Sequence, residues 1–218
     1  TKPAETYIEK EAEEVVEITM EAIKLLSLGE TPEKIGTKTI EKVISGLKNK
    51  KAKDMSLWKN EYIKAGGAEM VKSIEKIMNH VDKIHEIHTE WNRMKIKSIH
   101  KKGPKRKMKN KRGLFITNLI SKIFERVVKG RNEGRTRLSP MQTGGIKLRS
   151  TIDNVMTILA VIERNLYLGK STIVTFADVE KCFDRMWLDD GIKDLWKNGM
   201  RARDCMVLKK LNETAEVT

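Results

Sequence analysis

The stretch STIVTFADVEKCFDRMW, residues 171–187, decides the fold expected for this chain. Its first half, Thr172 to Ala177, is rich in β-branched and aromatic residues, which predicts a short buried strand. Asp178 closes that strand, and residues 183–187 continue at a spacing suited to one or two helical turns. A carboxylate at the C-terminal end of a strand faces the crevice beside a sheet, where substrates and metal ions can reach it. Asp178 is therefore a candidate ligand, although an aspartate in this place can also simply cap the following helix.

Basic charge is concentrated in one segment of the chain. The net charge is +14, and residues 91–150 contain nineteen Lys or Arg against two Glu. The rest of the chain is close to neutral, and residues 1–28 are acidic. Such clustering predicts a polyphosphate partner such as a nucleic acid. An anionic membrane surface could attract the same charge, but no basic amphipathic helix rich in aromatic residues accompanies it.

Length and cysteine content bound the class of protein. The 218 residues are enough for one sizeable domain, or for one whole subdomain and part of another. The two cysteines, Cys182 and Cys205, give no disulfide framework, which suits a reducing compartment. No signal peptide opens the chain, and its longest apolar run, residues 155–162, is too short to span a bilayer. We expect an intracellular protein of the nucleus and cytoplasm, with no membrane partner.

Helical periodicity dominates the rest of the sequence. Apolar residues at helical spacing predict helices over residues 7–28, 39–47 and 68–84, and two more that begin near Thr117 and at Ser150. In the first helix the expected buried face consists of Val15, Ile18, Ala22 and Leu25. Thr117 is the expected cap of the fourth helix, and Ser150 with Asp153 forms a capping box for the fifth. Apolar and basic residues alternate over residues 91–100, which predicts a half-buried strand before a turn at Gly103-Pro104.

The segment that contains this turn is the most basic of the chain. Eight of the twelve residues 101–112 are Lys or Arg. A run of this kind can be a solvated surface, a nuclear-import signal, or a loop that binds phosphates. Charge alone does not choose among the three.

Residues 176–184, FADVEKCFD, resemble the first catalytic motif of reverse transcriptases, Phe-x-Asp-Val-x-Lys-Ala-Phe-Asp. The resemblance implies that Asp178 binds two Mg²⁺ ions (or Mn²⁺) and that Val179 offers its backbone carbonyl to one of them. It also implies that Phe183 is the gate against a ribose 2′-hydroxyl. Paired hard cations held by oxygen ligands suit the chemistry of phosphoryl transfer.

Three upstream blocks resemble the same family in its LINE-like, non-LTR retrotransposon branch. Residues 47–67 are similar to the opening motif, with Ser56-Leu57 in the place of an Asp-Gly turn. Residues 99–103 (IHKKG) and 112–113 (RG) look like the fingers hairpin, which implies that Lys101 or Lys102, with Arg112, neutralises the incoming triphosphate. Residues 139–154 are similar to Gln-x-Gly-Phe followed by Gly-Arg-Ser-Thr-x-Asp-Asn, with Leu148 in the place of a Gly. Arg149 is there a candidate contact to the template backbone, or a solvent-exposed side chain.

The resemblance implies an RNA-directed DNA polymerase that binds an RNA template, a DNA primer and a dNTP. We expect an α+β fold: helix-rich right-hand polymerase fingers with a small antiparallel sheet and the first palm strand, truncated. The expected divisions are an N-terminal helical region (1–46), a fingers-like part (47–170) and the start of the palm (171–218).

The family's second catalytic motif, a Tyr- or Phe-x-Asp-Asp hairpin, does not follow Asp178 in these 218 residues. We therefore expect the polypeptide not to polymerise by itself. One alternative is a non-catalytic, basic RNA-binding remnant of such a domain. A second alternative is a wholly helical basic protein with an unrelated role.

Overall fold

The structure is a computed structural model that describes residues 10–179, 186–213 and 216–217. The chain divides into two compact units, Thr1–Thr136 with Trp187–Thr218, and Arg137–Met186. The fold is α+β and helix-rich, with a small antiparallel hairpin, as predicted from the sequence. No helix of the described residues combines the length and the apolar character needed to cross a bilayer.

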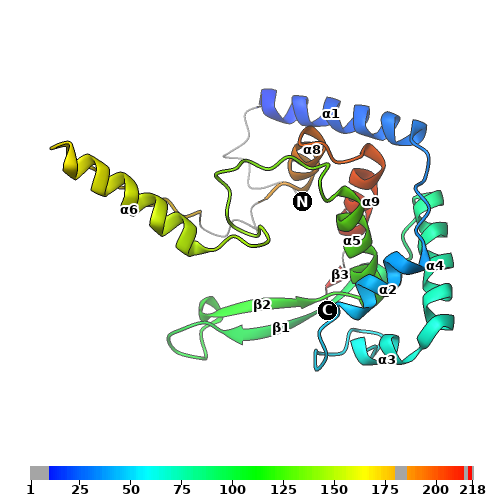
Figure 1. Ribbon diagram of the computed structural model, residues 1–218. Helices are drawn as coiled ribbons and strands as arrows, with labels where there is room; N and C mark the ends of the chain where they lie inside the picture. Colours follow the sequence, from blue (N-terminus) through cyan, green and yellow to red (C-terminus); the bar gives the residue numbers. More distant parts are fainter. Residues whose placement is uncertain (1–9, 180–185, 214–215, 218) are drawn as a thin grey trace. The chain divides into compact units, whose positions relative to one another are not determined.

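The first unit contains most of the secondary structure (Figure 1). Its α-helices are α1 (Lys10–Gly29), α2 (Thr37–Ser45), α3 (Asn60–Ala65), α4 (Gly67–Ile84), α5 (Leu119–Asn132), α8 (Leu188–Lys197) and α9 (Ala202–Glu213). Its short 3-10 helices are η2 (Thr89–Asn92) and η3 (Met108–Asn110), and its strands are β1 (Arg93–His100), β2 (Lys111–Ile116) and β3 (Glu216–Val217). The second unit contains α6 (Thr151–Tyr167).

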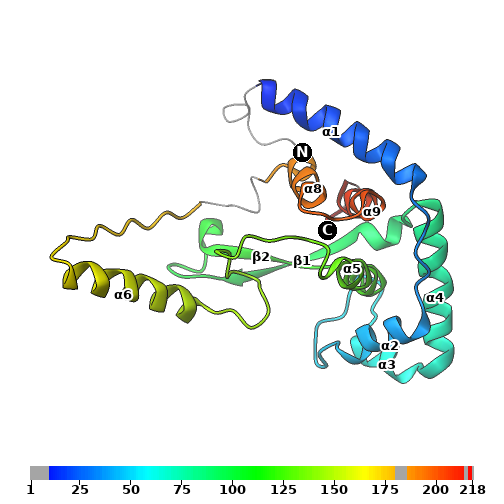
Figure 2. The ribbon, with the colours of Figure 1, turned by 45° about the horizontal axis from the view of Figure 1, so that its top comes forward.

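One hydrophobic core fills the first unit. Helix α1 packs against α8 and α9, and α2 packs against α4 and α5; Figures 1 and 2 show both groups from two directions. Phe124 of α5 is fully buried, and its ring contacts that of Trp91 edge to face, with 5.8 Å between the ring centroids. The apolar faces predicted for α2, α4 and α5 are largely buried, and the residues that confirm this are Ile40, Ile44, Leu47, Val71, Ile74, Met78, Val81, Leu119, Ile123 and Val127.

The buried face predicted for α1 is wrong. The structure buries Val16, Met20 and Ile23, whereas Val15, Ile18 and Leu25 are at least half exposed. Apolar residues occur on both sides of this helix, so periodicity alone allows either face. The contact with α8 and α9 selects the side that is buried.

The cap of α5 also differs from the prediction. Asn118, not Thr117, is the capping residue, and its Oδ1 accepts hydrogen bonds from the N–H groups of Ile120 (2.9 Å) and Ser121 (3.3 Å). Asparagine is among the best residues for this task because its short side chain reaches the free N–H groups of the first turn. The capping box of α6 is confirmed, since the N–H of Ser150 donates to Oδ2 of Asp153 at 2.7 Å.

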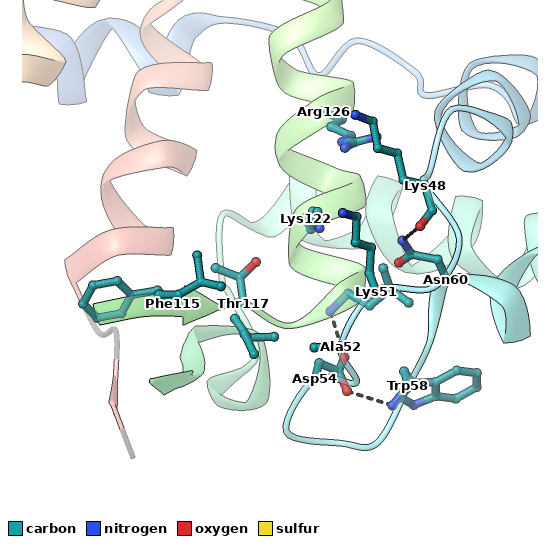
Figure 3. A pocket seen from close by; sticks show the side chains of 13 residues that line it. Lys48, Lys51, Ala52, Asp54, Trp58, Asn60, Phe115, Thr117, Lys122 and Arg126 are labelled. Carbon is teal, nitrogen blue, oxygen red and sulfur yellow. Dashed lines mark hydrogen bonds between the residues drawn. The ribbon is translucent and has the colours of Figure 1, made fainter. Parts of the chain in front are cut away.

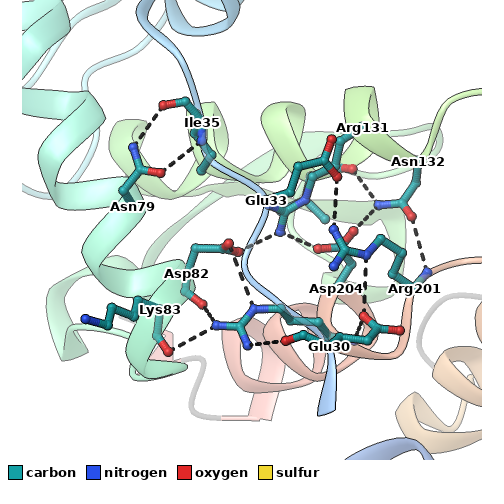
Figure 4. A network of polar contacts seen from close by, with 12 residues as sticks. Glu30, Glu33, Ile35, Asn79, Asp82, Lys83, Arg131, Asn132, Arg201 and Asp204 are labelled. Carbon is teal, nitrogen blue, oxygen red and sulfur yellow. Dashed lines mark hydrogen bonds and ion pairs between the residues drawn. The ribbon is translucent and has the colours of Figure 1, made fainter. Parts of the chain in front are cut away.

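A buried polar network joins α4, α5 and α9 (Figure 4). Arg131 of α5 donates to Oδ1 of Asp82 at 2.7 Å and forms an ion pair with Asp204. The side chains of Asp82, Arg131 and Asp204 are 1%, 8% and 0% exposed. Burial opposes the charge of Arg131, but the hydrogen bond to Asp82 and the charge of Asp204 outweigh it, so the pKa of Arg131 lies above its ordinary value. The two aspartates therefore keep the buried Arg131 protonated.

The start of α9 is held by a side chain from the other end of the sequence. The carboxylate of Glu30 accepts hydrogen bonds from the N–H groups of Ala202 (3.2 Å) and Arg203 (3.1 Å). The guanidinium of Arg203 in turn donates to the carbonyl oxygens of Asp82 and Lys83, at the C-terminal end of α4. An acid at a helix start and a cation at a helix end both satisfy free backbone groups, so these contacts dock α9 in the unit.

Strands β1 and β2 form the predicted antiparallel hairpin, in a register that pairs Lys95 with Ile116 and His100 with Lys111. The short strand β3 pairs in parallel with the other edge of β1. The strand predicted over residues 91–100 is present as β1, and the turn after it is confirmed, but the strand is not half-buried: only Arg93 and Met94 are partly buried, and the other six residues of β1 are exposed. The alternative of a wholly helical protein is therefore wrong.

The strand predicted over Thr172 to Ala177 is not formed. Residues 171–179 form no regular secondary structure and belong to no sheet, and Asp178 is exposed instead of facing a crevice. A strand needs a neighbour that accepts its hydrogen bonds and covers its apolar side chains. No described strand pairs with this segment, and Ile173 and Phe176 are 92% and 83% exposed.

Helix α6 of the second unit is also uncovered, since none of its residues is buried. The predicted apolar face includes Leu159 and Leu166, which are 45% and 68% exposed. The helix has the predicted extent and cap, but its apolar side chains have no covering surface within the described part of this unit.

Two leucines occupy a backbone conformation that suits glycine. Leu57 and Leu148 have φ values of +64° and +65°. These are the two positions where the sequence has Leu and the resembled motifs have Gly. The structure thus explains the customary glycine, because a residue without Cβ adopts positive φ at little energetic expense.

We expect Leu57→Gly to stabilise the first unit. The left-handed conformation disfavours a residue with Cβ by about 1–2 kcal/mol, and the greater freedom of glycine in the unfolded chain offsets about 0.4–1 kcal/mol of that gain. Leu57 is 66% exposed, so little packing is lost. Urea unfolding should show a midpoint above that of the wild type, whereas Leu28→Gly, in α1 at an exposed position, should lower it. A midpoint reduced by Leu57→Gly would contradict the assigned backbone strain.

Candidate functional site

The basic hairpin tip consists of residues 99–112, that is, the turn between β1 and β2 and the adjoining ends of the two strands. The N–H of Lys101 donates to the carbonyl oxygen of Asn110 at 2.8 Å, which closes the end of the hairpin. Arg112 pairs in register with Ile99, two residues before Lys101. Lys101, Lys102 and Arg112 therefore come from the two sides of one tip, as the resemblance implied.

Contacts within the tip hold its backbone in place. The side-chain amide of Asn110 donates to the carbonyl oxygen of Pro104 at 3.0 Å, and Nε2 of His100 lies 2.7 Å from the carbonyl oxygen of Gly103. Gly103 has φ +76°, and a Cβ there would lie 2.8 Å from Nδ2 of Asn110. The positive φ favours glycine, and a side chain at this position would displace the amide of Asn110 from its hydrogen bond to Pro104, so the sequence here suits a defined turn.

The cationic side chains at this tip are available to an anion. Lys101, Lys102 and Arg112 are exposed, and none of them forms an ion pair with a carboxylate in the described ranges of the chain. A guanidinium can bind two phosphate oxygens at once, and a lysine ammonium binds phosphate as a point charge. The tip can therefore bind a phosphate-bearing ligand.

The other predicted site residues lie elsewhere in the chain. Arg149, Asp178 and Val179 belong to the second unit, and all three are exposed. Phe183 lies outside the described residues. The roles assigned to all of these residues stay predictions.

Asp178 and Val179 offer the type of ligand atom that Mg²⁺ binds, but two residues are too few to complete a metal site. The carboxylate of Asp178 and the backbone carbonyl of Val179 are oxygen ligands, which Mg²⁺ prefers, and Mg²⁺ commonly keeps several waters beside one or two carboxylates. No cluster of three or more His, Cys, Asp or Glu side chains suited to a metal occurs in the ranges that the structure describes. These two residues could therefore contribute to a magnesium site that also needs ligands from elsewhere.

A second basic site, which sequence reasoning missed, is a pocket of about 300 Å³ in the first unit (Figure 3). It lies between the segment that precedes α3, the end of β2 and the first half of α5. Four cationic side chains line it, from Lys48, Lys51, Lys122 and Arg126. The opening motif pointed to the residues around Lys48 and Lys51, but the charge count of residues 91–150 drew attention to the hairpin tip instead.

The chain matches a model of a protein family. The model for "Reverse transcriptase (RNA-dependent DNA polymerase)" matches residues 99–217, which is more than half of the chain. The matched range includes the hairpin tip, α5, α6 and the segment that contains Asp178. No curated protein matches the chain.

Proposed function

Because this chain belongs to the reverse transcriptase (RNA-dependent DNA polymerase) family, we propose that it supplies the fingers and the start of the palm of an RNA-directed DNA polymerase of LINE-like type. Its partners are an RNA template, a DNA primer and a dNTP, and it acts in the nucleus and cytoplasm. The observation that supports this role most directly is the hairpin, because Lys101 and Lys102 follow the end of β1 and Arg112 lies in β2 close to the same turn.

The hairpin tip would bind the triphosphate of the incoming nucleotide. Arg112 and one of the two lysines neutralise its charge, which orients the nucleotide for attack by the primer 3′-hydroxyl. Asp178 and Val179 would contribute oxygen ligands to Mg²⁺, which neutralises charge on the reacting phosphate and activates the attacking oxygen. Phe183 would exclude a ribose, and Arg149 would contact the template backbone.

The exposed position of Asp178 supports a second part of the proposal. A pair of catalytic metal ions needs several carboxylates held close together. Among the described residues, Asp178 does not belong to a cluster of three or more His, Cys, Asp or Glu side chains that could hold a metal ion. We infer that these 218 residues bind nucleotide and nucleic acid but do not complete the reaction alone.

Primer extension tests this inference. The 218-residue chain, with an RNA template, a DNA primer, dNTPs and Mg²⁺, is expected to give no extended product. Asp178→Ala is the matched control for the wild type. A template-dependent product that disappears in Asp178→Ala would overturn the inference, because it would show a complete catalytic site in this polypeptide.

The second candidate function is a non-catalytic RNA-binding remnant, favoured by the concentration of charge in residues 91–150. It predicts salt-sensitive RNA binding that depends on Lys101, Lys102 and Arg112 and is unchanged in Asp178→Ala. It also predicts no preference for a nucleoside triphosphate. Nucleotide binding therefore separates it from the polymerase proposal.

A further inference from the structure

The pocket between the segment at residues 48–58 and α5 is lined by four cationic side chains and by one carboxylate, that of Asp54. Lys122 and Arg126 are four residues apart on α5, so they project from the same face of the helix. Lys48 and Lys51 extend toward them from the neighbouring segment (Figure 3). None of the four forms an ion pair with a carboxylate of the described residues. Like charges at this spacing repel each other unless an anion lies between them.

The carboxylate that lines the pocket is already engaged. Asp54 is 5% exposed, and its two oxygens accept hydrogen bonds from the N–H groups of Trp58 (2.8 Å) and Leu119 (2.9 Å). Glu125 interacts with Lys122 but does not line the pocket, and its own burial raises its pKa. The pocket therefore has a surplus of positive charge.

Hydrogen bonds hold the segment at residues 48–58 in position before any ligand arrives. The side-chain amide of Asn60 donates to the carbonyl oxygen of Lys48 at 2.6 Å, and Oε1 of Glu61 accepts from the N–H of Lys50 at 2.6 Å. At the other end of the segment, Asp54 ties it to the start of α5. A preorganised site does not lose binding free energy to ordering of its backbone.

From these observations we propose that this pocket binds a phosphate group of a single-stranded nucleic acid. Its volume of about 300 Å³ suits one phosphate with part of its nucleotide. Trp58 and Phe115 also line the pocket and are 39% and 51% exposed; Figure 3 shows their rings at its outer edges, directed away from the four cations, where a base next to the bound phosphate can stack. The free N–H groups at the start of α5 take no part, since Asn118 and Asp54 already cap them.

The proposal deepens the proposed function, since it assigns the nucleic acid a binding site in the first unit apart from the hairpin tip. Its test uses the whole chain and a fluorescent 12-nucleotide RNA without secondary structure, followed by fluorescence anisotropy. Two pocket variants are compared with the wild type, Lys51→Gln with Lys122→Gln, and Lys48→Gln with Arg126→Gln. The control is Lys42→Gln with Lys76→Gln, which removes two exposed cations outside the pocket. Far-ultraviolet circular dichroism verifies that each variant is folded.

Each pocket variant is expected to bind the RNA about tenfold more weakly, and the slope of log K against log salt should become shallower by about 0.7 for each phosphate that the variant no longer neutralises. The control should change affinity less than about twofold, with the same slope as the wild type. Equal weakening in the control and the pocket variants would overturn the proposal, because it would reveal diffuse attraction only. Unchanged binding in the pocket variants would also overturn it.

The same assay with a 5′-hydroxyl and a 5′-phosphate RNA identifies which phosphate is bound. Equal affinities for both, reduced alike in the pocket variants, assign an internal phosphodiester. Tighter binding of the 5′-phosphate RNA by the wild type, abolished in the pocket variants, assigns the end of the strand. Either result supports a phosphate pocket. The pocket proposal is tested by RNA binding, whereas the polymerase proposal is tested by dNTP binding. A chain that does not bind dNTP could still bind RNA through the pocket, so the two proposals can be contradicted independently.

Discussion

Asp204→Ala should destabilise the first unit by about 3–5 kcal/mol, because it leaves the buried charge of Arg131 with one partner in place of two. Asp204 is fully buried, pairs with Arg131 and accepts the hydrogen bond of Asn132. A whole domain is stable by only about 5–15 kcal/mol, so the loss removes much of the unit's stability. Urea unfolding followed by circular dichroism measures it.

Two further variants separate this explanation from a general effect of mutation. Glu69→Ala removes the acid of an exposed ion pair with Lys72, with side chains that are 84% and 59% exposed, and should lower stability by less than about 1 kcal/mol. Asp204→Ala with Arg131→Met removes both members of this ion pair and leaves Asp82 to Arg203, so the loss should be smaller than the sum of the two single variants. Strict additivity, or a wild-type midpoint for Asp204→Ala, would show that the ion pair does not hold α9 in place.

Features that depend on neighbouring residues could be predicted from the sequence. The helices α2, α4 and α5 and the hairpin were found because apolar periodicity and turn chemistry are local signals. The local pattern predicted the hairpin and its basic character, whereas the choice of Lys101, Lys102 and Arg112 as phosphate-binding residues came from the resemblance to the reverse transcriptase family and stays a prediction. The α1 face was missed because both sides of that helix are apolar, and the contact with α8 and α9 decides between them.

Features that depend on distant residues could not be predicted. Arg131 and Asp82 are 49 residues apart in the sequence, and Asn132 and Asp204 are 72 apart. No periodicity connects such positions. The pocket likewise combines residues from 48 to 126, and only the fold brings them together. The prediction of a strand at residues 172–177 was wrong for a related reason. The local pattern of β-branched and aromatic residues is strong, but a strand also needs a second strand with which to form hydrogen bonds.

Replacement of Lys101, Lys102 and Arg112 by Gln should weaken dNTP binding by about 100-fold or more. Each hydrogen bond to a charged group contributes about 1.5–3 kcal/mol, and two or more of these side chains would contact the triphosphate. The control is Lys38→Gln, Lys42→Gln and Lys76→Gln, which changes the charge by the same amount at exposed positions away from the tip. It should leave the affinity nearly unchanged.

Calorimetric titration of the 218-residue chain with a Mg²⁺–dNTP complex tests the polymerase proposal most directly. We expect the wild type and the control to bind dNTP, the tip variant to lose this binding, and a deoxynucleoside monophosphate to bind far more weakly than the triphosphate. Absence of dNTP binding by the folded wild type, or equal losses in the tip variant and its control, would contradict the account.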